Sequence, residues 1–200
     1  MILGVLLAAG TGYRFDAQSH SDAENKLLAS LDNEPIVAHA ARTLTESSLD
    51  ATIAVVGHER KQVERALPEE MEVVANPDYE RGQSTSVRRG IVAARERDAE
   101  AVLFALGDMP RVSVETVDEL LRKYRDSTGD AGIVAPRYDG RRGNPVLFDS
   151  RYFDALATVE GDRGGRELLE SEPVAWVDVA NPGIHRDVDT LDDLRELRNE

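Results

Sequence analysis

The sequence predicts an α/β protein with three layers, in which helices cover both faces of a mostly parallel, Rossmann-like sheet. Apolar runs of strand length alternate with amphipathic segments of helix length along the whole chain. Two apolar runs, residues 2–8 and 101–106, lead into glycine-containing turns, which is typical of buried parallel strands. With 41% hydrophobic residues, the 200 residues are enough for one domain, which we expect to span residues 1–200.

The first half of the chain predicts three strands, each followed by a helix. Helix 84–97 has an N-terminal signal in its three hydroxyl residues, and residues 16–25, which have no apolar side chain beyond alanine, predict an exposed loop. The predicted elements are strands at 2–8, 51–56 and 71–75 and helices at 35–45, 59–67 and 84–97.

The second half continues the alternation. Ser113 and Thr116, which flank Glu115, indicate a capping box at the start of a helix. The predicted elements are strands at 101–106, 131–135, 145–148 and 174–179 and helices at 113–124, at 165–171 and from residue 190.

Charge and composition exclude several classes of function. The net charge is −14, with 38 acidic against 24 basic residues, so the surface repels polyanions and long nucleic acid is not expected as a partner. The same acidic, lysine-poor bias resembles that of halophilic proteins. Without cysteine there is no disulfide, thiolate nucleophile or cysteine zinc site. The apolar run 1–9 is too short to span a membrane, so we expect a soluble, cytoplasmic protein.

The loop after the first strand has the composition of an anion-binding turn. Gly10 and Gly12 let the backbone turn sharply and present amides, while Arg14 and Lys26 would neutralise phosphate charge. An ordinary turn is the alternative. Phe15 stands where a dinucleotide fingerprint needs its third glycine, and no Walker A sequence is present, so neither of those two motifs applies.

Three aspartates are candidates for a metal site. Asp108 lies just past the end of a buried strand, where open α/β sheets bind ligands, and one carboxylate there suits Mg²⁺. Asp187 and Asp189 point the same way on an extended segment, so one or both would complete the site. Capping of the last helix by Asp189 or Thr190 is the alternative, and whether Asp187 shares the metal stays open.

Three further segments suggest substrate contacts. In residues 76–89, a glycine and three hydroxyl residues at a helix start offer donors to a nucleobase or phosphate, or form an ordinary helix start. The loops 142–146 and 161–166 combine glycine with arginine and would form the wall of a second substrate site, although surface turns look similar. No histidine or serine spacing indicates a zincin or a hydrolytic triad.

Taken in order, six patches resemble the nucleotidyltransferase family that includes molybdenum cofactor cytidylyltransferase (MobA/MocA-like), within the glycosyltransferase-A-like group with the nucleotide-diphospho-sugar transferase fold. The patches are LAAGTGYRF with NKLL, NPDYERGQSTSVRRG, LGDMP, RGNPVLF, GDRGGRELL and DVDTLDDL.

The resemblance implies Mg²⁺-dependent transfer of a nucleoside monophosphate from a triphosphate to a phosphate of an acceptor, with release of pyrophosphate. It implies catalytic roles for Arg14, Lys26 and Asp108, a metal site at Asp108 and Asp189, and acceptor contacts at Asn144, Asp162 and Gly164. The nucleotide-binding residues that it implies are Leu7, Ala8, Ala9, Gly10, Thr11, Gly12, Asn76, Gln83, Ser84 and Ser86.

In this family an alanine at the position of Ala9 goes with cytosine, so the resemblance implies CTP as donor and molybdopterin as acceptor, with a molybdoenzyme receiving the product. An acceptor phosphate is already an anionic nucleophile, so no general base is needed. The chain departs from the family pattern in two places. Its loop 16–25 is longer than the family's usual few residues before the lysine, and it has Gly143-Asn144-Pro145 where the family has a Gly-His-Pro-like motif.

The alternatives are guanylyl transfer to molybdopterin or phospholactate, a sugar-phosphate nucleotidylyltransferase, a nucleotide-binding chaperone for cofactor insertion, and a Rossmann oxidoreductase.

Overall fold

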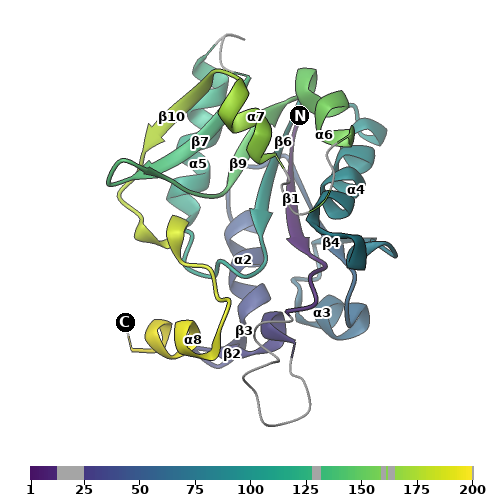
Figure 1. The fold of residues 1–200 in the computed structure, drawn as a ribbon, viewed down its shortest axis with the longest axis vertical. Coiled ribbons are helices and arrows are strands. Elements are labelled where there is room, and N and C mark those ends of the chain that lie inside the picture. Colours follow the sequence, from purple (N-terminus) through teal and green to yellow (C-terminus); the bar gives the residue numbers. More distant parts are fainter. Residues whose placement is uncertain (13–24, 128–131, 159–160, 162–164, 200) are drawn as a thin grey trace.

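The structure is a computed structural model that describes residues 1–12, 25–127, 132–158, 161 and 165–199. Its centre is a sheet whose strands follow the order β10-β7-β9-β6-β1-β4-β5, with β8 paired to β7 (Figure 1). The strands are β1 (Ile2–Ala8), β4 (Ala51–Val56), β5 (Glu72–Ala75), β6 (Ala101–Leu106), β7 (Ile133–Tyr138), β8 (Arg141–Arg142), β9 (Val146–Asp149) and β10 (Val174–Asp178).

The mostly parallel sheet is confirmed. β1 is central and runs parallel to both β4 and β6, and β4 is parallel to β5 and β10 to β7. β9 runs antiparallel to both β6 and β7. Only residues 139–145 separate β7 from β9, which is shorter than the crossover that a parallel connection needs.

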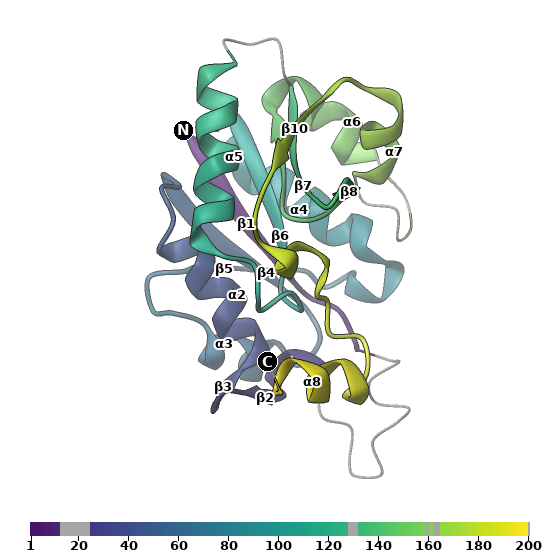
Figure 2. The same ribbon diagram turned by 90° about the vertical axis from the view of Figure 1, so that its left-hand side faces the viewer.

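Helices cover both faces of the sheet, which confirms the three layers (Figure 2). On one face, α2, α3 and α5 share an apolar cluster with Ile2, Leu6 and Ala8 of β1, and on the other face α4 and α6 share one with Leu3 and Val5. The alternation along β1 follows from the two-residue period of a strand. The helices are α2 (Ile36–Thr45), α3 (Arg60–Ala66), α4 (Gln83–Glu96), α5 (Val114–Asp126), α6 (Phe153–Thr158), α7 (Arg166–Ser171) and α8 (Leu191–Leu197).

A third apolar cluster joins residues 29–36 to the C-terminal segment. It combines Leu31 and Ile36, beside the small hairpin of β2 (Ser30–Leu31) and β3 (Glu34–Pro35), with Val188, Leu194 and Leu197 around α8. Because this cluster holds the segment before α8 against the region of residues 25–36, residues 26 and 189 lie together at one edge of the sheet.

Most predicted elements form within a few residues of their expected bounds, and the exceptions have local causes. The N-cap of α4 is Gly82 rather than a serine, and no side chain caps this helix. Ser84, Thr85 and Ser86 lie inside its first turn instead, where the Thr85 hydroxyl donates to the Gly82 carbonyl at 2.8 Å. Ser113 does cap α5, because its hydroxyl accepts from the Thr116 amide.

The sequence reasoning missed the β2–β3 hairpin, β8 and the six-residue helix α6, which are too short to show a hydrophobic period. Residue 131, the first of one predicted strand, lies outside the described residues. Within the part of the chain that is described, none of the helices combines the length and the hydrophobicity needed to cross a membrane.

Candidate active site

Two neighbouring parallel strands deliver the central residues of the site. Leu7 of β1 lies opposite Leu106 of β6, so the loops after both strands leave the sheet at the same edge. The amide of Gly107 donates to the Leu7 carbonyl at 3.0 Å, which ties the second loop to the first. The amide of Val188 donates to the Asp108 carbonyl at 2.9 Å. This bond places Asp187 and Asp189 beside Asp108.

Lys26 lies between two carboxylates at this edge. Its Nζ is 2.7 Å from Asp108 Oδ2 and 3.0 Å from Asp189 Oδ1. The three side chains are 14%, 19% and 30% exposed in that order, so the cluster is partly shielded from water. The short 3-10 helix η1 (Lys26–Leu28) fixes the lysine, because Leu27 is buried and the Asn25 side chain accepts from its amide.

The pKa values of the lysine and of one acid in the cluster are both raised, for different reasons. Burial opposes the charged ammonium, but attraction by Asp108 and hydrogen bonds to both carboxylates outweigh it, so the pKa of Lys26 is raised. Burial and repulsion from Asp108 and Asp189 raise the pKa of the Asp187 carboxyl. Lys26 is therefore a fixed positive charge that partly neutralises three acids.

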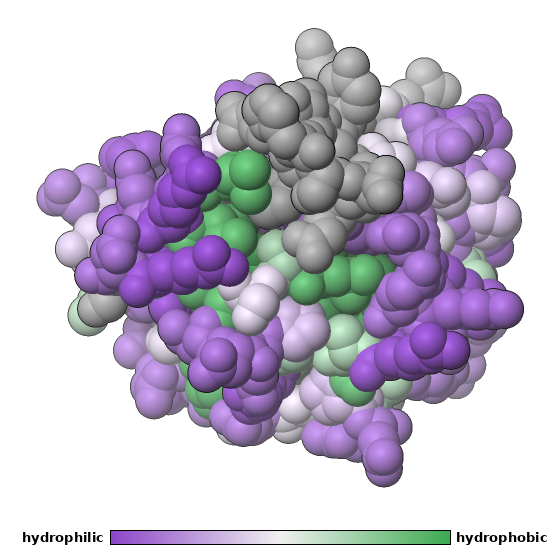
Figure 3. Space-filling model, turned by 90° about the horizontal axis from the view of Figure 1, so that it is seen from below, coloured by the Kyte–Doolittle hydropathy of each residue, from purple (hydrophilic) through white to green (hydrophobic). Residues whose placement is uncertain are grey.

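A cavity of about 640 Å³ opens over this cluster. It is lined by the loop after β1, the cluster itself and the start of α4, and the end of the molecule that carries it shows hydrophobic surface between hydrophilic side chains (Figure 3). The expected site residues that line it are Leu7, Ala9, Gly10, Thr11, Gly12, Lys26, Gln83, Ser86, Asp108 and Asp189.

Three expected nucleotide contacts lie behind the cavity wall instead. Ala8 and Ser84 are fully buried, and the Ser84 hydroxyl has no hydrogen-bond partner among the described residues. The buried Asn76 amide donates to the Thr85 hydroxyl at 2.8 Å and to the Ser86 hydroxyl at 2.9 Å. Asn76 therefore holds the first turn of α4 in place, and Ser86 is the member of the group that reaches the cavity.

Arg14, Asp162 and Gly164 lie outside the described residues. Sequence reasoning did not single out Tyr79, although it lines the cavity. Tyr79 packs against Gly57, where a Cβ would lie 2.6 Å from the Tyr79 Cβ. Glycine at the end of β4 thus permits the close approach of the tyrosine.

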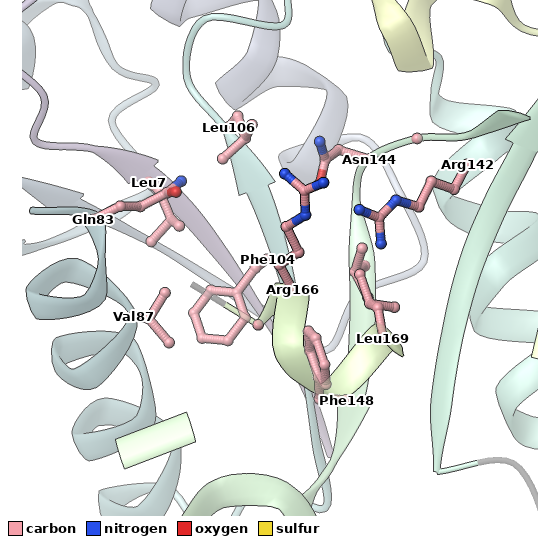
Figure 4. Close-up of a pocket in the computed structure, with 13 residues that line it drawn as sticks. Leu7, Gln83, Val87, Phe104, Leu106, Arg142, Asn144, Phe148, Arg166 and Leu169 are labelled. Atoms are coloured by element: carbon pink, nitrogen blue, oxygen red, sulfur yellow. The ribbon is translucent and has the colours of Figure 1, made fainter. Parts of the chain in front are cut away.

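A second cavity, of about 270 Å³, shares Leu7, Gln83 and Leu106 with the first. It includes Asn144, an expected acceptor contact, and it is drawn in Figure 4. The two cavities therefore meet along one wall, as two substrates that react with each other require.

The donor set fits a divalent cation that takes few ligands from the protein. Asp108 Oδ2 binds Lys26, whereas Asp108 Oδ1 is buried without a hydrogen-bond partner among the described residues. Those residues contain no group of three or more histidine, cysteine, aspartate or glutamate side chains that would enclose a metal. Two carboxylates supplemented by water and phosphate oxygens match the preference of Mg²⁺.

Known proteins resemble this chain both in sequence and in fold. The family model of the MobA-like NTP transferase domain matches residues 4–176. The chain is 32% identical to the nicotine blue oxidoreductase of Paenarthrobacter nicotinovorans, over 98% of this chain and 96% of that protein. It also resembles Rv0371c of Mycobacterium tuberculosis H37Rv in complex with manganese, with 28% identity, a TM-score of 0.75 and coverage of 100% and 98%.

The fold itself is shared with the nucleotidyl transferase Mth528 of Methanothermobacter thermautotroptrophicus, with a TM-score of 0.83 at 23% identity and coverage of 100% of this chain and 96% of that one. The mostly parallel mixed sheet and its flanking helices are those of the nucleotide-diphospho-sugar transferase fold. With the family model covering most of the sequence, the chain belongs to the MobA-like NTP transferase family and is a nucleotidyltransferase.

Proposed function

We propose that the protein transfers CMP from CTP to the phosphate of a molybdopterin-type acceptor, with Mg²⁺ as cofactor. The observation that carries the proposal is the position of Lys26 between Asp108 and Asp189, at 2.7 and 3.0 Å, in the wall of a cavity bordered by the loop of residues 9–12. This arrangement collects one cation, two acids and a set of backbone amides around a space of about 640 Å³.

Asp108 and Asp189 would hold the metal, which supplies charge neutralisation at the triphosphate when bound. A relative, Rv0371c, has been solved with manganese. In the nucleotide complex, Lys26 would turn from the two carboxylates toward the phosphates and balance the charge that develops on the leaving pyrophosphate. The loop amides of Gly10 and Gly12 would orient the phosphates from the opposite side.

The acceptor would enter the second cavity and present its phosphate oxygen to the α-phosphorus. That oxygen forms the new P–O bond while the bond from the α-phosphorus to pyrophosphate breaks, and no proton has to be removed from the nucleophile. Rate enhancement then comes from positioning and electrostatics.

For the base, we propose recognition by Gln83 and Ser86, which line the cavity at the first turn of α4. Their amide and hydroxyl groups can both donate and accept hydrogen bonds. Ala9, also in the lining, is the residue that favours cytosine over guanine under the family resemblance.

The test is pyrophosphate release with CTP, GTP, ATP and UTP, each combined with molybdopterin, phospholactate and a sugar 1-phosphate. We expect turnover with CTP and molybdopterin, and an Asp108→Asn variant that is slower by about a hundredfold or more. Asp98→Asn is the matched control, because Asp98 is exposed and lies three residues before the start of β6, at the opposite end of the sheet. Wild-type turnover in Asp108→Asn would refute the metal role, and turnover with another pair would reassign the substrates.

One observation favours a second candidate. The relative with 32% identity is named an oxidoreductase, so hydride transfer on the same scaffold has to be tested. Phe15 replaces the third glycine of a dinucleotide fingerprint, which argues against a nicotinamide cofactor. Titration with NADH and NADPH should leave their fluorescence unchanged, and a saturable change would favour the oxidoreductase.

We place this reaction in the cytoplasm, because the absence of cysteine suits a reducing compartment. A molybdoenzyme would receive the product. The net charge of −14 suits a cell of high internal salt, where screening weakens self-repulsion.

A further inference from the structure

The second cavity has two ends of different chemistry. The rings of Phe104 and Phe148 pack edge to face with centroids 6.3 Å apart, and Val87 lies beside them. In Figure 4 these side chains lie toward one end, and Asn144 with two guanidinium groups lies toward the other. Aromatic and aliphatic walls of this kind bind flat or apolar groups.

The guanidinium groups belong to Arg142 of β8 and Arg166 of α7, two elements that are distant in the sequence. Both meet the same oxygen, Glu170 Oε1, at 3.2 Å from Arg166 Nε and 3.8 Å from Arg142 Nη2. A single carboxylate oxygen thus occupies the point on which two arginines converge.

The two ion pairs of Glu170 with Arg142 and Arg166 contribute little to the stability of the fold. The side chains of Arg142, Arg166 and Glu170 are 37%, 67% and 60% exposed, and exposed salt bridges contribute little to stability. A phosphate dianion offers more acceptor oxygens and more charge than one carboxylate, and it suits the planar fork of arginine. An anionic ligand can therefore displace Glu170 at small cost.

We propose that Arg142 and Arg166 bind the anionic group of the acceptor, that Glu170 holds this position in the free protein, and that the acceptor is an aromatic or otherwise apolar organic phosphate. The inference rests on the proposed function and narrows its acceptor. A sugar phosphate would need hydrogen-bonding partners along its whole ring. Among the described lining residues, Gln83 and Asn144 are the only uncharged polar side chains.

The location of the anion agrees with the reaction. Leu106 lies toward the guanidinium end of the cavity in Figure 4 and also lines the nucleotide cavity. A phosphate held by the two arginines would therefore lie near the shared wall, with its apolar body directed toward Phe104 and Phe148.

The experiment measures binding without turnover, by calorimetric titration of the whole protein with 1-naphthyl phosphate, glucose 1-phosphate and inorganic phosphate. We expect 1-naphthyl phosphate to bind at least about tenfold more tightly than the other two, because only this probe uses both ends of the cavity. Arg142→Gln and Arg166→Gln should each weaken its binding by about tenfold or more, the usual effect of losing a hydrogen bond to a charged group.

The matched control is Arg60→Gln. The Arg60 side chain is 50% exposed, between the values for Arg142 and Arg166, and pairs with Glu64 on α3, outside both cavities, so this variant should bind as the wild type does. Glu170→Gln should strengthen binding about two- to fivefold, since it removes the competing carboxylate. Leu169 also lines the second cavity, so Leu169→Asn should weaken the binding of 1-naphthyl phosphate and leave that of inorganic phosphate unchanged.

Unchanged binding in both arginine variants, or equal binding of glucose 1-phosphate, would overturn the inference. Both results are independent of catalysis. If pyrophosphate release fails while the probe binds as expected, the proposed function is wrong and the anion site stands.

Discussion

Replacing Lys26 by methionine tests the central cluster most directly. Methionine has a similar length but neither charge nor donor, so the variant leaves Asp108 and Asp189 facing each other without the ammonium that now lies 2.7 and 3.0 Å from them. The sequence contains only two other lysines, Lys61 and Lys123. Lys61→Met, at an exposed position on α3, is the matched control.

The expected loss of stability follows from the two contacts. Each hydrogen bond between charged groups contributes about 1.5–3 kcal/mol, and relief from desolvating the buried ammonium offsets part of the sum. We therefore expect Lys26→Met to lower the free energy of unfolding by about 2–4 kcal/mol in the absence of metal. Because the pKa of Lys26 is raised above its ordinary value of 10.5, this contribution is fully present at pH 7 and is lost only in strongly alkaline solution.

The same variant should bind Mn²⁺ more tightly without nucleotide, because no ammonium competes for the two carboxylates. Urea unfolding with and without Mn²⁺, together with calorimetric titration of Mn²⁺, measures both effects, and Mn²⁺ should restore part of the lost stability. Pyrophosphate release should nevertheless fall by about a hundredfold or more. If Lys26→Met and Lys61→Met share the same unfolding midpoint and Mn²⁺ affinity, the reasoning about the cluster is wrong.

Three further predictions concern stability. Asp149 accepts from the Tyr124 hydroxyl at 2.8 Å and from Arg151, and although burial opposes its ionisation, these hydrogen bonds hold its pKa below the ordinary value of 3.8. Asp149→Asn should therefore lower the free energy of unfolding by about 1–3 kcal/mol at pH 7. The difference in stability from wild type should shrink below pH 3.8, as urea unfolding midpoints at pH 7 and below pH 3.8 will show. An equal difference at the two pH values would contradict this prediction. Gly183→Ala should unfold at a clearly lower temperature than Gly10→Ala. A Cβ at position 183 would lie 1.8 Å from the Arg111 carbonyl oxygen, whereas no atom lies within 4 Å of a Cβ at position 10. Similar melting temperatures of the two variants would argue against this contact. Asp193 closes the capping box of α8 and accepts hydrogen bonds from the amides of Asp189 and Thr190. Asp193→Ala should therefore lower the free energy of unfolding by about 1 kcal/mol and, because Asp189 loses a contact, weaken Mn²⁺ binding. An unaltered Mn²⁺ affinity would exclude this effect on the metal site.

The comparison of sequence and structure separates local from non-local information. The apolar runs at residues 2–8 and 101–106 predicted strands with the observed bounds. A strand that is buried on both faces of a sheet needs consecutive apolar residues, and such a run is visible in the sequence. The six ordered motifs likewise indicated the family, since each motif is short and contiguous.

Tertiary packing decided how those motifs meet. Lys26 lies 82 residues from Asp108 and 163 from Asp189, and only the adjacent strand ends, the third apolar cluster and the bond from Val188 to Asp108 bring them together. The sequence also offered Asn76 and Ser84 as ligand contacts, but the turn into α4 buries both of them behind the cavity.

The residues next to a polar residue in a motif do not determine the direction in which its side chain points. That direction depends on helices and strands that arrive from elsewhere in the chain, as does the convergence of Arg142 and Arg166 on Glu170. The sequence by itself thus determined the elements and the chemical groups available to the site. The packed fold alone selected which of those groups share a cavity, because long-range contacts set the position of each loop.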